Sequence, residues 1–174
     1  MLVCTLGDVL LDVIVRLERP LAVGDDVRAA TQLVPGGQAA NVAAWTVELG
    51  ARGRVVAKRA DDAAGRLVAT GLARRGVELA GPVVEGRTGV VVSIVEPGGE
   101  RSLASDRGVA AELAPDELDE AWFADCDVLH VSGYALAASP IAAAAERAAA
   151  LAPRVSVDLS SWTAIEELGP VLFR

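Results

Sequence analysis

Aromatic residues, cysteine and histidine are scarce in this sequence. Phe, Trp and Tyr make up 3% of the 174 residues, and there are two cysteines and one histidine. Cys4 and Cys126 each lie in or beside an apolar, strand-like run, and two such cysteines form neither a disulfide framework nor a metal-binding spacing. His130 also lies inside an apolar run, where a packed core histidine is commoner than a catalytic one. We therefore expect buried cysteines, no metal site and no Ser-His-Asp triad.

Basic stripes and long apolar runs are also lacking. The net charge is −8, and the arginines are scattered, which argues against a nucleic-acid-binding surface. The amino-terminal apolar run is interrupted by Asp8 and Asp12, so we expect neither a signal peptide nor a membrane span. On these grounds we expect a cytoplasmic protein with no nucleic-acid or membrane partner.

The sequence is instead rich in Ala and Val. Apolar residues make up 52% of the chain, a composition that is typical of helices packed on a Val-rich sheet. The length suits one domain with a substantial core. The expected strands cover residues 2–6, 9–17, 27–34, 54–57, 77–84, 88–95, 100–105, 128–131 and 155–157, and the expected helices cover residues 38–49, 63–75, 115–124, 139–151 and 162–168.

The order of these elements predicts the fold class. From residue 54 onward strands alternate with helices, apart from a hairpin over residues 88–105 whose Pro97 and Gly98 suit a type II turn. Alternation predicts right-handed crossovers and a largely parallel sheet with helices on both faces. Residues 9–34 and the hairpin do not alternate with helices. We expect them to form a separate small sheet over the carboxyl ends of the main strands, where ligands gather in such folds.

Two adjacent glycines, Gly36 and Gly37, directly precede an expected helix. Glycine lets the backbone approach a ligand closely, and a helix start offers unpaired N–H donors and the positive end of a dipole. Asn41, near the first turn, needs a partner from the protein or from a ligand. Two interpretations are open: a tight turn with Asn41 bonded to nearby backbone, or the floor of a binding site.

Other charged residues also admit a structural and a functional interpretation. Asp12 lies within a run of Leu, Val and Ile, where a carboxylate either faces water or accepts hydrogen bonds from a polar ligand. Asp61 and Asp62 precede an expected helix, and we favour helix capping for them. Arg107 follows the hairpin and is either a solvated loop charge or an anchor for an anionic or hydroxylated ligand.

A series of short segments carries a family resemblance. The segments are Gly7–Asp12, Gly24–Val27, Pro35–Ala43, Asp61–Gly65, Thr88–Val91, Ser105–Gly108, Asp127–Gly133 and Asp158–Ser160. In order and spacing they resemble the ribokinase-like (PfkB) carbohydrate kinases across essentially the whole chain. The Gly-Gly-x-x-x-Asn segment is the most specific of them, and the series is more specific than any single member.

The resemblance implies an α/β, ribokinase-like fold with a largely parallel sheet, helices on both faces and a small β-strand lid. Residues 1–174 would be the amino-terminal part of the kinase domain, with lid strands within 9–34 and 88–105. The implied activity is ATP-dependent phosphorylation of a sugar hydroxyl, with a sugar or nucleoside as small-molecule partner and a homodimer formed through the lid strands. The implied substrate-binding residues are Asp12, Gly36, Gly37, Asn41 and Arg107.

The sequence also departs from the family pattern. The family's carboxy-terminal half, with an Asn-x-x-Glu segment, the nucleotide pocket and a Gly-Ala-Gly-Asp motif that supplies the catalytic base, is missing from these 174 residues. No catalytic residue and no site for ATP or Mg²⁺, which the family uses, is readable here, so we expect the chain alone to be inactive. Ser160 and Trp162 stand where the family's Asp-x-Asn-x-Arg segment has Asn and Arg.

Alternatives to a kinase remain at this point. One is a non-catalytic sugar- or nucleoside-binding or dimerisation module of the same descent. A dinucleotide-binding domain is disfavoured because the segment from Gly7 to Val9 is not Gly-x-Gly-x-x-Gly. In the family, the carboxy-terminal half would cover the strand near Val155. Without that half, this strand would expose its edge and apolar sheet faces, so we expect the chain to self-associate.

Overall fold

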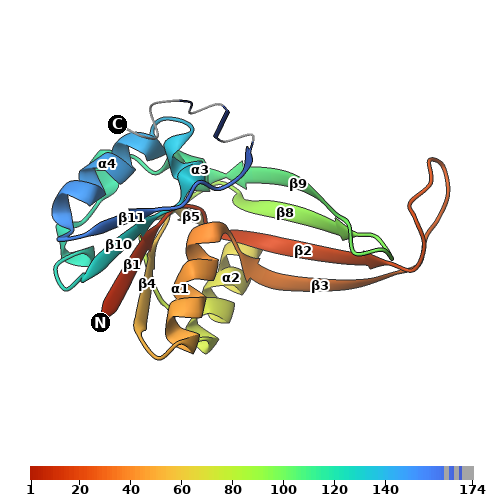
Figure 1. The fold of residues 1–174 in the computed structure, drawn as a ribbon, viewed down its shortest axis with the longest axis horizontal. Helices are drawn as coiled ribbons and strands as arrows, with labels where there is room; N and C mark the ends of the chain where they lie inside the picture. Colours follow the sequence, from red (N-terminus) through yellow and green to blue (C-terminus); the bar gives the residue numbers. More distant parts are fainter. Residues whose placement is uncertain (163–164, 167–168, 170–174) are drawn as a thin grey trace.

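The computed structural model describes residues 1–162, 165–166 and 169. The helix predicted over residues 162–168 therefore lies mostly outside the described residues. The described part consists of a helix-covered body and a sheet that projects from it (Figure 1).

The body is built on a five-stranded parallel sheet. Its strands are β1 (Leu2–Leu6), β4 (Arg52–Val56), β6 (Glu78–Ala80), β10 (Val128–Val131) and β11 (Val155–Val157), in the order β11-β10-β1-β4-β6. Every neighbouring pair is parallel. The parallel sheet predicted from the alternation of strands and helices is confirmed.

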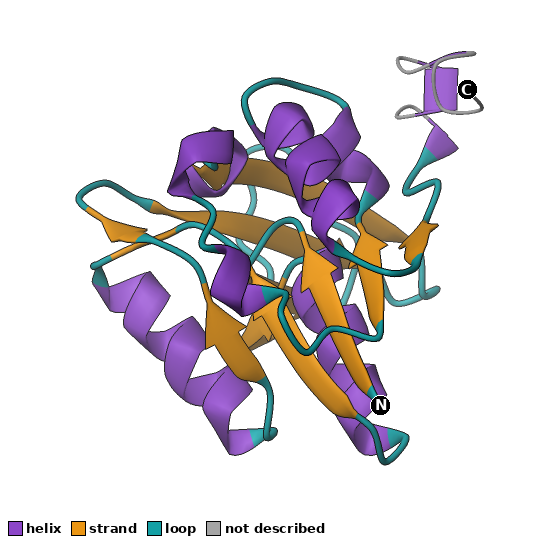
Figure 2. Cartoon of the chain, turned by 90° about the vertical axis from the view of Figure 1, so that its left-hand side faces the viewer, coloured by secondary structure: helices purple, strands orange, loops and turns teal. Residues whose placement is uncertain are grey.

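Helices cover both faces of this sheet (Figure 2). Helices α1 (Gln38–Glu48) and α2 (Ala63–Arg74) pack on one face, and α4 (Ile141–Leu151) packs on the other beside the short α3 (Gly133–Leu136). Side chains that alternate along β4 separate the two cores, because Val55 belongs to one and Val56 to the other. Cys4 and Cys126 are buried free thiols, as predicted.

Helix α1 lies close to the sheet because both the helix and the strand that it contacts, β4, present small residues at their interface. Its buried side is formed by Ala39, Ala40, Ala43 and Ala44. On β4, a Cβ at Gly53 would collide with the carbonyl of Ala43. This close packing fixes the start of α1, and therefore Gln38 and Asn41, relative to the ends of the strands.

The projecting sheet has four strands in the order β3-β2-β8-β9. They are β2 (Leu10–Leu17), β3 (Ala29–Gly36), β8 (Thr88–Val95) and β9 (Arg101–Gly108), with β2 and β8 parallel and the outer pairs antiparallel. A separate small sheet was predicted from these segments, and one is present. A third, two-stranded sheet joins β5 (Arg59–Ala60) to β7 (Val83–Val84).

The register gives the projecting sheet two distinct faces, since directly paired residues point to the same side. The inner face carries Leu10, Asp12, Ile14, Val91, Ser93, Arg101, Leu103, Ser105 and Arg107. The outer face carries Leu11, Val13, Val15, Leu33, Val90, Val92 and Ile94. The outer face is mainly apolar, with Thr31, Ser102 and Asp106 on its outer strands. The inner face mixes apolar, hydroxyl and charged side chains.

Two predicted elements are wrong in their extent. The strand expected over residues 77–84 is split at Gly81, where φ is 112° and a Cβ would collide with the carbonyl of Ala57. The acidic helix expected over residues 115–124 is replaced by the 3₁₀ turns η2 (Pro115–Glu117) and η3 (Glu120–Trp122), which follow η1 (Val109–Glu112). Leu113, Leu118 and Phe123 all enter the core, and their five-residue spacing does not place them on one face of a helix.

The hairpin also differs from the prediction. Gly98 is not among the residues with positive φ, so the turn is not of type II; Gly99 has φ 92° and its N–H bonds to the carbonyl of Glu96. Strand β9 continues to Gly108, so Arg107 is a strand residue and not a loop residue.

Asp62 begins α2 and ties it to β8. Its carboxylate accepts hydrogen bonds from the N–H of Gly65 at 2.7 Å, the N–H of Thr88 at 2.9 Å and the hydroxyl of Thr88 at 2.7 Å. Burial alone would raise the pKa of Asp62, but these bonds outweigh it and hold the pKa below its ordinary value. The capping role favoured for Asp62 is confirmed, whereas Asp61 is exposed and pairs with Arg66.

A bidentate ion pair joins the body to the projecting sheet. Arg107 donates through Nε to Asp8 Oδ2 at 2.7 Å and through Nη2 to Asp8 Oδ1 at 2.8 Å. Asp8 follows β1 and its side chain is 8% exposed, against 26% for Arg107. Charge-assisted pairs with this parallel geometry are the strong ones, so the pair fixes the inner face of β9 against the carboxyl end of the main sheet.

Replacing Arg107 by Met should lower the free energy of unfolding by about 2 to 3 kcal/mol, because it leaves the buried Asp8 carboxylate without a counter-charge. Urea denaturation measures the change. The matched control is Arg87→Met, which removes an exposed pair with Asp106 and should leave the free energy of unfolding nearly unchanged, because solvent screens such a pair. Equal costs for the two variants would contradict the structural role of the Asp8–Arg107 pair.

Replacing Asp62 by Ala should cost about 1 to 3 kcal/mol at neutral pH, since a helix cap and the partners of Thr88 are lost together. Because the folded-state pKa is depressed, this stabilisation is present above the unfolded pKa and is lost as the pH falls through the folded pKa. Denaturation at several pH values should show the cost shrinking below about pH 4. The control variant Asp61→Ala should change the free energy of unfolding little at any pH. A loss of stability in Asp62→Ala that does not depend on pH would contradict the stabilising role of the Asp62 carboxylate.

Candidate functional site

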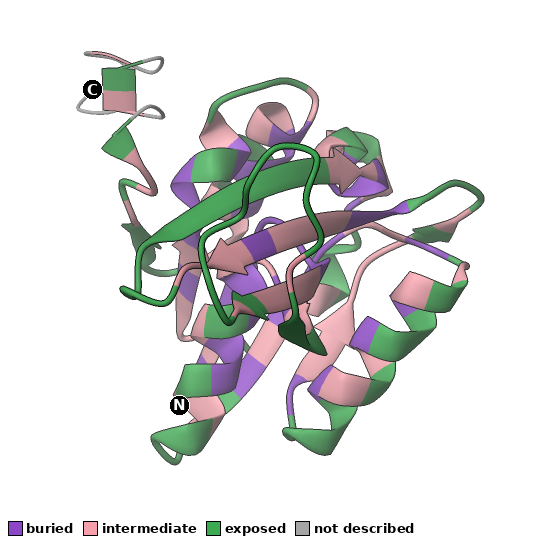
Figure 3. Cartoon of the chain, turned by 90° about the vertical axis from the view of Figure 1, so that its right-hand side faces the viewer, coloured by how far each residue is buried: buried purple, intermediate pink, exposed green. Residues whose placement is uncertain are grey.

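A cavity of about 500 Å³ lies between the inner face of the projecting sheet and the start of α1. It is lined by Asp8, Leu10, Asp12, Ile14, Gly37, Gln38, Asn41, Val91, Ser93, Arg101, Leu103, Ser105, Arg107, Tyr134 and Ser160. Strand β9 on its far side is exposed along most of its length (Figure 3). The cavity therefore joins a rigid floor on the body to a more open wall on the sheet.

The two glycines of the floor are needed by the fold itself. Gly37 has φ 91°, and a Cβ there would collide with the carbonyl of Asp8. At Gly36 a Cβ would overlap the Asp12 carboxylate. Gly37 lines the cavity directly, whereas Gly36 lies behind Asp12 and lets that carboxylate sit against the backbone.

Asp12 presents a carboxylate that the protein does not satisfy. It forms no hydrogen bond or ion pair with any described residue, although the side chain is partly buried on the inner face. Burial raises the pKa of Asp12, and the positive charge of Arg101 partly offsets this. A carboxylate in such a place is a ready acceptor for hydroxyl donors of a ligand.

Asn41 lies in the first turn of α1 and lines the same cavity. Among the described residues its side-chain amide has no hydrogen-bond partner, so it does not form the local backbone bond that one interpretation required. Its amide offers both donors and an acceptor. The structure thus brings Asp12, Gly37, Asn41 and Arg107 to one cavity, with Gly36 directly behind it.

A polar network at the rim was not foreseen from the sequence. The side-chain oxygen of Gln38 accepts hydrogen bonds from the hydroxyls of Ser132 at 3.0 Å and Ser160 at 3.1 Å. Asp158 accepts from the N–H and hydroxyl of Ser160, both at 2.8 Å. Ser160 has a φ of 59°, a conformation that non-glycine residues rarely adopt and that these bonds hold in place.

His130 belongs to the outer part of this network. Its Nδ1 lies 2.7 Å from Ser156 Oγ and its Nε2 lies 3.1 Å from Asp158 Oδ2. Both ring nitrogens therefore have partners within the protein. This agrees with the packed, structural histidine expected from the sequence.

The arginines of β9 divide into a paired and an unpaired one. Arg107 is engaged by Asp8, while Arg101 lines the cavity and makes no hydrogen bond or ion pair with a described residue. Sequence reasoning singled out Arg107 and missed Arg101. The signal was the alternation of Arg101, Leu103, Ser105 and Arg107, which places all four on one face of a strand.

Other features do not compete with this cavity for a polar ligand. A cavity of about 630 Å³ between α2 and β3 is lined by apolar residues, a threonine and arginines, without a carboxylate or amide. Within the described residues, no group of three or more His, Cys, Asp or Glu side chains could hold a metal ion. No helix in that part of the chain is long and apolar enough to cross a membrane.

Comparisons with known proteins extend along most of the chain. A family model described as pfkB family carbohydrate kinase matches residues 1–164. The 5-dehydro-2-deoxygluconokinase of Shouchella clausii is 35% identical over 133 residues, which are 74% of this chain and 40% of that protein. The ATP-dependent ribose-1-phosphate kinase of Halopiger xanaduensis is 33% identical over 133 residues, 75% of this chain and 45% of that protein. Fructokinase-1 of Zea mays is 31% identical over 165 residues, 91% of this chain and 50% of that protein.

Solved structures share the fold. The adenosine kinase from Sinorhizobium meliloti superposes with a TM-score of 0.82 at 24% identity, covering 94% of this chain and 58% of that one. A fructokinase from Xylella fastidiosa gives 0.76 at 24% identity, covering 93% and 53%. The chain spans 40 to 50% of the length of the curated relatives described above. With the family model matched over residues 1–164 and the ribokinase-like sheet arrangement present, the chain belongs to the pfkB family of carbohydrate kinases.

Proposed function

We propose that this chain forms the sugar-binding half of an ATP-dependent carbohydrate kinase. The single observation that carries the proposal is that the partly buried Asp12 and the exposed Asn41, whose side chains have no hydrogen-bond partner among the described residues, line one cavity with a glycine floor. Uncharged, multiply hydroxylated ligands are held by a few fixed polar groups on a rigid floor. Asp12 would accept hydrogen bonds from sugar hydroxyls, Asn41 would bond another hydroxyl, and Gly36 and Gly37 would bring backbone N–H groups close.

The relatives' names support a kinase and leave the sugar open. They are a 5-dehydro-2-deoxygluconokinase, a ribose-1-phosphate kinase and a fructokinase. All are kinases, which favours this function over a non-catalytic module. A cytoplasmic location, expected from the sequence, would give such an enzyme access to ATP.

Phosphoryl transfer needs a phosphate cradle, Mg²⁺ and a base that positions the acceptor hydroxyl. The described residues of this chain hold no candidate metal cluster, and the motif that carries the base in the family is not in the sequence. We therefore propose that these residues bind and orient the sugar, while ATP and Mg²⁺ are held by the remaining half of a complete kinase. The 174 residues alone should bind sugar without turnover.

The projecting sheet would act as a lid and as a dimerisation surface. The Asp8–Arg107 pair holds its inner face over the cavity. Its outer face carries Val13, Val15, Val92 and Ile94, which are only partly buried, and Leu33, which is 58% exposed. An apolar sheet face of this kind is typical of a protein interface, and a second copy of the chain would cover it.

Calorimetric titration of the chain with D-fructose, D-ribose and adenosine tests sugar binding. We expect at least one of these ligands to bind, and Asp12→Asn and Asn41→Ala each to weaken binding by about tenfold, because hydrogen bonds to the ligand are lost. Asp116→Asn, which removes the same charge from an exposed position outside the cavity, should leave binding unchanged. Absence of binding to all three ligands, or binding that neither cavity variant weakens, would contradict the proposal.

Sedimentation velocity tests the dimer. We expect the chain to sediment as a dimer and Leu33→Lys to shift it to monomer, because a charge in an apolar interface is not solvated. Leu49→Lys is the matched control, since Leu49 is 83% exposed at the end of α1 and away from the projecting sheet. Association through the edge strand β11 would persist in Leu33→Lys and would overturn the assignment of the interface to the outer face.

A further inference from the structure

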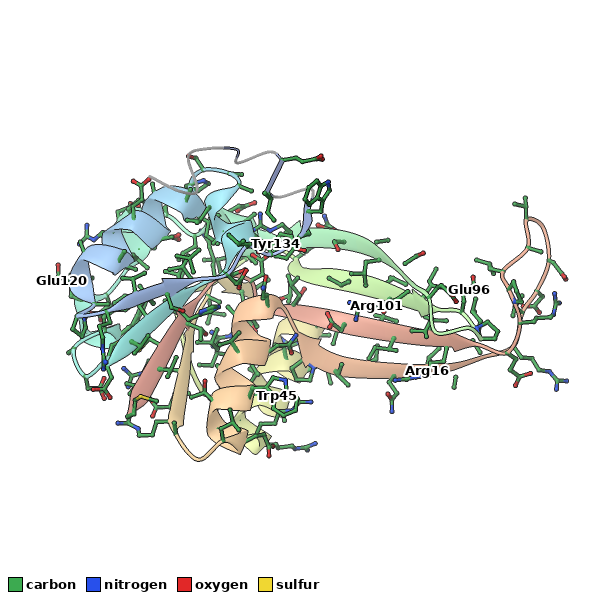
Figure 4. All side chains as sticks on the ribbon, in the orientation of Figure 1. Arg16, Trp45, Glu96, Arg101, Glu120 and Tyr134 are labelled. Atoms are coloured by element: carbon green, nitrogen blue, oxygen red, sulfur yellow. The ribbon has the colours of Figure 1, made fainter. Side chains whose placement is uncertain are left out.

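The loop between β2 and β3, residues 18–28, has a shape that its own hydrogen bonds hold. Its two ends are joined by a bond from the N–H of Glu18 to the carbonyl of Arg28 at 3.0 Å. Arg19 crosses the loop and donates to Asp25 Oδ2 at 2.9 Å. In Figure 4 this tip loop stands clear of the helices that cover the main sheet. A loop that is already ordered loses little conformational freedom on binding, so the tip loop is suited to docking.

The tip loop presents apolar side chains beside an unpaired carboxylate. Leu21 is 56% exposed and Val23 is fully exposed. The carboxylate of Asp26 makes no hydrogen bond or ion pair with any residue that the structure describes, although the backbone of Asp26 is bonded within the loop. Apolar side chains so far from any core, next to a free charge, are typical of a segment that contacts another protein surface.

A groove of about 630 Å³ lies at the opposite end of the outer face, where α2 meets β3. Leu11, Leu33 and Pro35 line it, and the register places all three on the outer face of the projecting sheet. On α2, a Cβ at Gly71 would collide with the ring of Pro35, so the helix lies directly against the strand there. Leu33 is 58% exposed, and Leu67 of α2 is 52% exposed. The α2–β3 groove is therefore an open apolar recess that continues the outer face.

The charged side chains that line the α2–β3 groove are all positive. They are Arg66, Arg74 and Arg75. Arg66 already pairs with Asp61, and Arg75 shares a neighbouring small cavity with Glu48. The side chain of Arg74 has no hydrogen bond or ion pair within the described part of the chain. The groove thus keeps an uncompensated positive charge at Arg74 and suits an apolar segment that carries a carboxylate.

We propose that the tip loop of a second copy of the chain docks in the α2–β3 groove. The inference rests on the proposed dimer and deepens it, because it names the segment that fills the recess next to the outer face. Leu21 and Val23 of each copy meet the apolar walls of the groove on the other copy, and Asp26 faces Arg74. Each projecting sheet is then held at its base by its own body and at its tip by the second copy.

A two-fold axis that runs across the strands explains how loop and groove meet. Such an axis lays the tip of each sheet over the base of the other, so the same contact forms twice. From Leu11 at the base to Leu17 at the tip, β2 advances about 20 Å, and Val13 and Val15 lie between them on the outer face. An axis along the strands would instead set the two tip loops, each with its Asp26 carboxylate, against each other and leave both grooves empty.

Disulfide cross-linking between copies of the 174-residue chain tests the docking. Val23→Cys/Leu67→Cys, oxidised with copper phenanthroline, should give about tenfold more covalent dimer on a non-reducing gel than a matched control, because a disulfide forms only between neighbouring positions. The control is Val23→Cys/Glu120→Cys, since Glu120 is exposed and lies at the far end of the body from the tip loop in Figure 4. Cys4 and Cys126 are buried and should not react.

A charge exchange measured by sedimentation velocity tests the pairing within the contact. Asp26→Arg and Arg74→Asp should each raise the dissociation constant of the dimer about tenfold, because each sets like charges together at two equivalent contacts. The double variant Asp26→Arg/Arg74→Asp should return the constant close to the wild-type value. Asp116→Arg makes the same charge change at an exposed position outside the outer face and the groove, and it should leave the constant unchanged.

The outcomes separate this inference from the proposed function. If the chain is a dimer but Val23→Cys/Leu67→Cys cross-links no more than its control, the outer-face dimer stands and the docking of the tip loop is overturned. Covalent dimers of Val23→Cys alone would show that two tip loops meet each other, which also overturns it. A monomeric chain overturns the dimer and the docking together, whereas sugar binding is measured independently by calorimetric titration.

Discussion

The bidentate pair between Asp8 and Arg107 is the interaction on which the cavity depends. Asp8 belongs to the carboxyl end of the first main strand, and Arg107 belongs to the inner face of the last strand of the projecting sheet. The two residues are 99 positions apart in sequence. Because Asp8 is nearly buried, its charge needs this partner, so the wall of the cavity is held against its floor. Asp62 and its bonds to Thr88 provide a second tie at the base of β8.

Crowding around the floor explains why two glycines precede α1. A Cβ atom at Gly37 would collide with the carbonyl of Asp8, and one at Gly36 would collide with the carboxylate of Asp12. The structural and functional interpretations of this stretch are therefore not exclusive. The turn is tight for reasons of packing, and next to it Asp12 and Asn41 line the cavity without a side-chain hydrogen bond to any residue in the described part of the chain. A polar group that packing places in a cavity without a protein partner is available to a ligand.

Much of the fold could be predicted because local patterns and tertiary packing agree. The helix from Gln38 and the helix capped by Asp62 follow from glycine and capping signals, and the buried strands follow from short runs of Val and Leu. The predictions failed where long-range contacts decide. Residues 115–124 have the acidic residues of a helix start, but the buried Leu118 and Phe123 and the hydrogen bonds from Lys58 to Glu117 favour separate turns. Strand β6 ends before Gly81, whose φ of 112° departs from strand geometry, and the nearby carbonyl of Ala57 leaves room for glycine alone.

The sequence by itself determined the periodicity of the strands and helices, the glycines of the floor and the cap of α2, because these depend on neighbours within a few positions. It also identified Asp12 and Asn41 as polar groups in apolar surroundings. Only the tertiary structure decided which of these groups meet and which charges cancel. The sequence pointed to Arg107 as an anchor and not to Arg101, yet Arg107 is held by Asp8, whereas Arg101 lines the cavity without a hydrogen bond or ion pair to a described residue. That difference arises from strand register, which brings together residues that no local pattern connects.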